Sequence, residues 1–185
     1  MSKISRFTQR VVTLAKNAAS GRGEAAAPEG GDGFADYAVV SLYCLRVYVE
    51  QSYREALDWL SEMPHILAEI GLEPDELPDH PTLVKWIDRL TMAVWRVLLR
   101  LSAQEHEPSG EAAIDSTYFD RETASKHYCR RTNYRVQTLK TTALVDTASQ
   151  AVLAVHCTTT KKHDSLAADK GYDWQELRQK LREEG

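Results

Sequence analysis

The sequence predicts an α+β protein in which a helical N-terminal part precedes a β-sheet. In residues 1–23 and 34–103, apolar residues recur every three or four positions, which is the spacing of one helix face. In residues 112–157, short apolar runs are bounded by turn residues, which is typical of strands. A short polar link at 104–110 separates the two patterns. We therefore expect a basic helix with a linker at 1–33, a helical module at 34–106 and a sheet domain at 107–185.

Composition narrows the classes of protein to consider. The net charge of −4 weakly disfavours a nucleic-acid binder, because such proteins usually carry an excess of basic residues. No apolar run reaches the roughly 20 residues needed to span a bilayer, so no membrane partner is expected. The three cysteines have no metal-ligand spacing, which favours packed thiols in a reducing compartment.

The first 23 residues carry five basic residues and no acidic one. Their apolar residues follow helical spacing, which predicts a basic amphipathic helix. One interpretation is a docking helix with a solvated basic face, and the other is an organelle transit peptide. Residues 21–33 are rich in glycine, alanine and glutamate, which predicts a flexible linker.

Start and stop signals divide the next segment into helices. Residues 36–51 are rich in valine and tyrosine, but the length of the apolar run favours a helix over a strand. Ser52 and Glu55 have the spacing of a capping box. Pro64 suits the first turn of a short helix, and Gly71 suits its C-terminal cap.

The clearest helix is expected from Pro81 to about Leu101. Its buried stripe is accompanied by four basic residues that fall within an arc of roughly 60° on a continuous helix. Such a stripe could follow a phosphate backbone or form an ordinary solvated face, and the two interpretations are evenly balanced. The four basic residues are Lys85, Arg89, Arg96 and Arg100.

Strands are predicted at 112–119, 134–145, 151–157 and 166–168, and the second and third should form an antiparallel hairpin. Asp115 stands in the middle of the first strand, and Asp169 directly follows the last. A carboxylate among apolar neighbours is costly unless it is paired, and a divalent cation is one such partner. The alternative is a carboxylate at a strand edge that accepts a hydrogen bond from a neighbouring backbone N–H. Two aspartates on adjacent strands favour the metal site.

Between the first two strands, residues 120–133 combine basic residues with a histidine and a tyrosine. Basic and aromatic side chains beside a metal site predict a track for DNA phosphates. A hydrated hairpin tip is the alternative. The basic residues expected to bind DNA here are Arg121, Lys126, Arg130 and Arg131.

Three short segments in the second half of the chain resemble those of a known protein family. They are Ala-Ile-Asp-Ser-Thr-Tyr-Phe-Asp-Arg-Glu (113–122), Tyr-Arg-Val-Gln-Thr-Leu-Lys-Thr-Thr-Ala-Leu-Val-Asp (134–146) and Ala-Asp-Lys-Gly-Tyr-Asp (168–173). Together they resemble the front of the catalytic domain of DDE-type insertion-sequence transposases, of the kind found in halophilic archaea. The resemblance implies a partial ribonuclease-H-like mixed sheet with helices. It also implies two Mg²⁺ or Mn²⁺ ions, with Asp115 as the first acidic ligand and Asp169 as the second.

The resemblance further implies DNA transposition, with metal-dependent strand cleavage and transfer at insertion-sequence ends. The family's third acid is a glutamate on a later helix, which this sequence does not reach, so we expect a truncated copy that is inactive by itself. The alternatives are a non-enzymatic fragment that occupies transposon ends and a remnant without a partner. Double-stranded DNA is the expected partner, the expected location is cytoplasmic at the nucleoid, and homodimer formation is left open.

Overall fold

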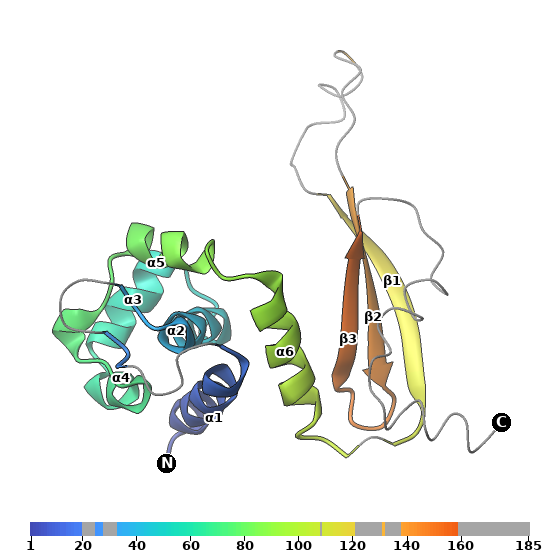
Figure 1. Ribbon diagram of the computed structural model, residues 1–185, viewed down its shortest axis with the longest axis horizontal. Helices are drawn as coiled ribbons and strands as arrows, with labels where there is room; N and C mark the ends of the chain where they lie inside the picture. Colours follow the sequence, from blue (N-terminus) through green and yellow to red (C-terminus); the bar gives the residue numbers. More distant parts are fainter. Residues whose placement is uncertain (20–24, 28–32, 108, 121–130, 132–137, 159–185) are drawn as a thin grey trace. The chain divides into compact units, whose positions relative to one another are not determined.

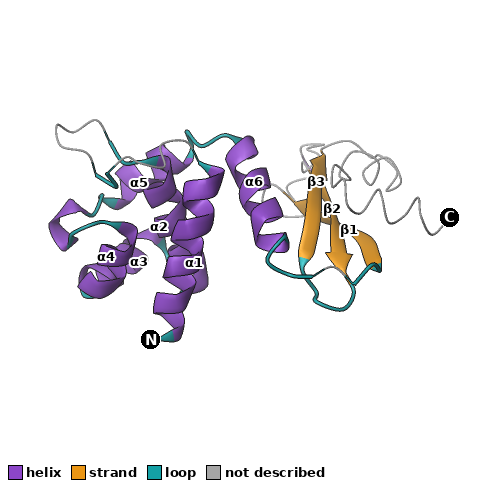
Figure 2. Ribbon diagram, turned by 60° about the horizontal axis from the view of Figure 1, so that its bottom comes forward, coloured by secondary structure: helices purple, strands orange, loops and turns teal. Residues whose placement is uncertain are grey.

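The computed structural model describes the chain except for residues 20–24, 28–32, 108, 121–130, 132–137 and 159–185 (Figure 1). The chain divides into two units, Met1–Leu101 and Ser102–Gly185, and each is considered by itself. Helices dominate the described part of the first unit, and strands dominate that of the second (Figure 2). The predicted α+β class is confirmed. None of the helices in the described ranges is long and apolar enough to cross a bilayer.

The N-terminal helices match the sequence signals closely. Helix α1 (Lys3–Ala18) begins after Ser2, whose side chain accepts a hydrogen bond from the Ser5 backbone N–H. Helix α2 (Asp36–Tyr48) has buried residues on nearly every side, because it packs against α1, α3 and α5. This burial explains why its valines and tyrosines form a helix despite their preference for strands. The predicted helices at both positions are confirmed.

Both shorter helices begin where predicted, and the second also ends where predicted. Helix α3 (Tyr53–Ser61) has the expected capping box, in which Ser52 and Glu55 satisfy each other's backbone N–H groups. Helix α4 (Pro64–Ile70) starts on its proline and ends at Gly71, which has a left-handed conformation with φ of +93°. A 3₁₀ turn, η1 (Pro74–Glu76), leads to the next helix.

The expectation of one helix from Pro81 to Leu101 is wrong. The structure has α5 (His80–Ile87) and α6 (Met92–Ala103), separated by a turn at 88–91. Asp79 caps α5 by accepting a hydrogen bond from the Thr82 backbone N–H. Neither glycine nor proline marks the break, and apolar residues on both sides of it still pack against the core, so the helical spacing continues through the turn.

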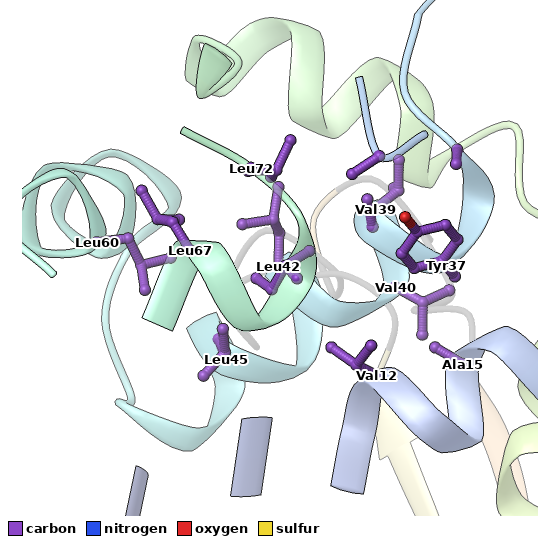
Figure 3. Packing of buried hydrophobic residues seen from close by; sticks show 14 of the residues in the cluster. Val12, Ala15, Tyr37, Val39, Val40, Leu42, Leu45, Leu60, Leu67 and Leu72 are labelled. Carbon is purple, nitrogen blue, oxygen red and sulfur yellow. The ribbon is translucent and has the colours of Figure 1, made fainter. Parts of the chain in front are cut away.

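The core of the first unit is built around α2. Figure 3 shows side chains from α1, α2, α3 and α4 converging, with Leu72 joining them after α4. Residues from α5 and α6 pack at its border. The most deeply buried large side chains of this unit include four from α2 and α4 and one from the residue after α4, namely Leu42, Leu45, Ile66, Leu67 and Leu72.

The second unit contains a three-stranded antiparallel sheet in the order β1-β2-β3. Its strands are β1 (Ala112–Asp120), β2 (Thr138–Asp146) and β3 (Val152–Thr158). The predicted hairpin of the second and third strands is confirmed, with an irregularity in the register at Leu144/Val145. The predicted fourth strand at 166–168 falls outside the described residues, and so does the parallel pairing that a mixed sheet needs. A ribonuclease-H-like fold therefore stays a prediction.

Candidate metal and nucleic-acid site

Asp115 is the centre of the candidate metal site, and the structure places it in the middle of β1. It pairs across the sheet with Ala143, which in turn pairs with Val155 on β3. Its side chain is exposed, and one carboxylate oxygen accepts a hydrogen bond from the Ser116 backbone N–H at 2.7 Å. This is the contact expected from the alternative interpretation. The desolvation cost inferred from sequence does not arise, because the carboxylate is exposed.

The sheet has two different faces, and Asp115 lies on the more open one. On the opposite face of the central strand, Thr142, Leu144 and Asp146 are buried. On the Asp115 face the exposed side chains include Phe119 and Val155. The other acidic side chain that is described in these strands belongs to Asp146, and alternation places it on the other face.

Asp115 therefore has no carboxylate neighbour on its own face of the described sheet. Within the described ranges, no group of three or more histidine, cysteine, aspartate or glutamate residues could hold a metal ion. The predicted second ligand, Asp169, lies outside those ranges. Mg²⁺ usually binds one or two carboxylates together with water or phosphate oxygens. Asp115 is thus accessible as one ligand, and the predicted pairing with Asp169 stays a prediction.

Asp146, at the end of β2, is a buried carboxylate that was not predicted as a site from the sequence. One oxygen accepts hydrogen bonds from the Ser109 backbone N–H and hydroxyl, at 2.8 and 2.7 Å. The other accepts from the Ser149 backbone N–H and hydroxyl, both at 2.8 Å. These four donors hold the pKa of Asp146 far below its usual range. Asp146 therefore ties the segment before β1 to the turn between β2 and β3.

The spacing Asp-x-x-Ser at 146–149 indicates the bonds between Asp146 and Ser149. An aspartate side chain can accept a hydrogen bond from a backbone N–H two or three residues ahead. The contribution of Ser109 has no local signal, because it comes from 37 residues earlier in the chain. Since all of the carboxylate's bonds hold the protein's own turns together, Asp146 has a structural role.

We expect the sheet to lose stability in acid through Asp146. Its pKa is lower in the folded chain, so the unfolded chain binds the proton first, and stability falls as pH drops below about 4. Thermal unfolding, followed by the amide NMR signals of β2, should shift to lower temperature between about pH 6 and about pH 3. Asp146→Asn should lower the unfolding temperature at the higher pH, and it should make that temperature depend less on pH. If the unfolding temperature of Asp146→Asn changed with pH in parallel with that of the unaltered chain, this role would be contradicted. Glu111 is exposed, so Glu111→Gln serves as the control.

The four predicted DNA-binding residues of the helical unit are all exposed. Lys85 lies on α5, Arg89 lies in the turn after it, and Arg96 and Arg100 lie on α6. The Arg89 guanidinium carbon lies 4.5 Å from the centroid of the Trp86 ring. Because the helix is broken, the 60° arc expected on a continuous helix does not apply. Arg96 and Arg100 remain one turn apart on the same helix face.

The other predicted DNA-binding segment is mostly outside the described residues. Arg121, Lys126 and Arg130 lie outside those residues, whereas Arg131 is described and is exposed. Its exposure is compatible with both a phosphate contact and a hydrated hairpin tip.

Comparisons with known proteins give no family assignment. The chain matches no protein-family model, no curated protein and no solved structure. The resemblance to transposases therefore rests on the three sequence segments alone.

Proposed function

We propose that this protein acts in DNA transposition, binding duplex DNA at insertion-sequence ends with a divalent cation held by Asp115 and Asp169. The observation that supports it best is the position of Asp115, an exposed carboxylate in the centre of an edge strand of the described sheet. A ligand in this position can reach a cation and the phosphate bound to it, because the described strands place no basic side chain on the face of Asp115. Mg²⁺ is the ion that carboxylate and phosphate oxygens favour.

In the proposed role, the cation would stabilise charge on the oxygens of the scissile phosphate, as two-metal nucleases do. The four exposed basic residues of α5, α6 and the turn between them would supply sequence-independent contacts to the backbone of the duplex. They are Lys85, Arg89, Arg96 and Arg100. Basic residues in the 121–131 segment would extend those contacts.

The second candidate function is occupancy of DNA ends without cleavage. It is favoured by the composition of the Asp115 face, on which the described strands supply a single carboxylate. One carboxylate is a poor basis for a two-ion centre, which needs a bridging ligand and further ligands for each ion.

A pair of assays on the same protein separates the two candidates. Duplex DNA carrying an insertion-sequence end is first tested for binding without metal, and then for nicking in Mg²⁺ or Mn²⁺. Nicking that disappears in Asp115→Asn, while DNA binding persists, would support metal-dependent cleavage. Binding without nicking would support end occupancy. Absence of duplex binding would reject both candidate functions. Asp58→Asn, which changes an exposed acid on α3, is the charge-matched control for Asp115→Asn.

A further inference from the structure

The exposed side of α1 is strongly basic, and helix stability does not account for it. Lys3, Arg6 and Arg10 are exposed, and on an ideal helix they fall within an arc of about 60°. The buried side of the helix is formed by other residues, among them Thr8, Val12 and Ala15. The first turn contains no acidic residue. Cations near a helix N-terminus oppose the helix dipole, so they cost stability there.

An aromatic pair borders these cations. The rings of Phe7 on α1 and Tyr48 on α2 are stacked, with centroids 4.2 Å apart and an interplanar angle of 19°. Phe7 lies four residues after Lys3 and three before Arg10, so all three share one side of the helix. The two helices lie side by side (Figure 1).

The outer ring of the pair is available for a further contact. Tyr48 is 43% exposed although Phe7 covers one face of its ring, so its exposed area lies on the other face and the ring edge. The neighbouring Val47 is 47% exposed. The acids nearest to this face are Glu50, which follows α2, and Glu69 on α4, whose carboxylate accepts hydrogen bonds from the Ser5 and Gln9 side chains of α1. The three basic residues exceed these two acidic charges by one.

We propose that this α1–α2 face binds single-stranded nucleic acid, with an unpaired base stacked on Tyr48 and the adjoining phosphates near Lys3, Arg6 and Arg10. A flat exposed ring beside cations fits an unstacked base, which duplex DNA does not offer. An anionic membrane fits less well, because the apolar side of α1 is already packed in the core and leaves little apolar surface to insert. The face uses none of the residues assigned to duplex binding or to the metal.

The test is the binding of a fluorescent oligothymidylate of about 12 nucleotides to the full chain, measured by anisotropy over a range of salt concentrations. Tyr48→Leu should weaken binding about 5- to 150-fold, whereas Tyr48→Phe should bind within about twofold of the unaltered chain. Replacing Lys3, Arg6 and Arg10 with glutamine should reduce the salt slope by about 2, since each phosphate contact on a single strand contributes about 0.7.

Two variants control for charge and aromatic content elsewhere on the unit. Trp59 is 46% exposed on α3 and Arg54 is exposed on the same helix, so Trp59→Leu and Arg54→Gln should leave oligothymidylate binding unchanged. Equal binding by Tyr48→Leu and the unaltered chain would overturn the proposal. So would binding to phosphatidylserine vesicles without binding to the oligonucleotide. Failure of the proposed function is separate, because it appears as lost duplex binding while oligothymidylate binding persists.

Discussion

Replacing Gly33 with alanine is expected to destabilise the helical unit severely. Gly33 has a φ of +103°, and a Cβ built there would lie 2.9 Å from Cε2 of Trp86 and would overlap Cζ2 and Cη2 of the same ring. The left-handed backbone should cost about 1–2 kcal/mol, and forcing the ring aside should add about 1–3 kcal/mol. For a unit of this size, the melting temperature followed by circular dichroism should fall by roughly 10 °C or more.

Gly71 offers a matched control for the free-energy cost of placing alanine in a left-handed backbone conformation. Its φ of +93° is similar, but a Cβ there would meet only Ala26 and Tyr37 at ordinary distances of 3.6 and 3.8 Å. Gly71→Ala should therefore cost about 1–2 kcal/mol. In a double-mutant cycle, Trp86→Ala should remove most of the extra cost of Gly33→Ala. Additive effects of the two substitutions would contradict the proposed overlap.

Removing the basic residues of α5, α6 and the turn between them should have the largest effect on duplex binding. If Lys85, Arg89, Arg96 and Arg100 each contact a phosphate, their joint replacement by glutamine should lower the slope of log affinity against log salt by about 3.5. Arg96→Gln alone should lower it by about 0.9.

The exposed Arg54 on α3 provides the control for this series. Arg54→Gln removes the same charge from a surface with no assigned phosphate contact, so its salt slope should match that of the unaltered chain. Equal slopes for Arg96→Gln and Arg54→Gln would mean that α6 presents an ordinary solvated face.

Local chemistry explains why much of the fold can be predicted from the sequence. The Ser52–Glu55 capping box and Gly71 act within a few residues, and both are formed as the spacing predicts. The turn at 88–91 was missed because the core needs apolar residues on both sides of it, so their helical spacing conceals the break.

The candidate sites depend more on residues that are distant in sequence. The four bonds to Asp146 combine a local turn with Ser109, and the stack of Phe7 on Tyr48 joins two helices. Neither contact follows from the spacing of residues in one element. The exposure of Asp115 likewise depends on the edge position of β1 in the described sheet, where Ile114 and Tyr118 on the opposite face are exposed as well, and strand alternation alone does not reveal that position.

The most direct test of the proposed metal site is Mn²⁺ binding, measured without DNA from the loss of the free-ion electron paramagnetic resonance signal. The unaltered chain should bind Mn²⁺ saturably. Asp115→Asn and Asp169→Asn should each weaken that binding at least about tenfold, whereas Asp58→Asn should leave it unchanged. Equal Mn²⁺ binding by Asp115→Asn and the unaltered chain would contradict the assignment of Asp115 as a metal ligand.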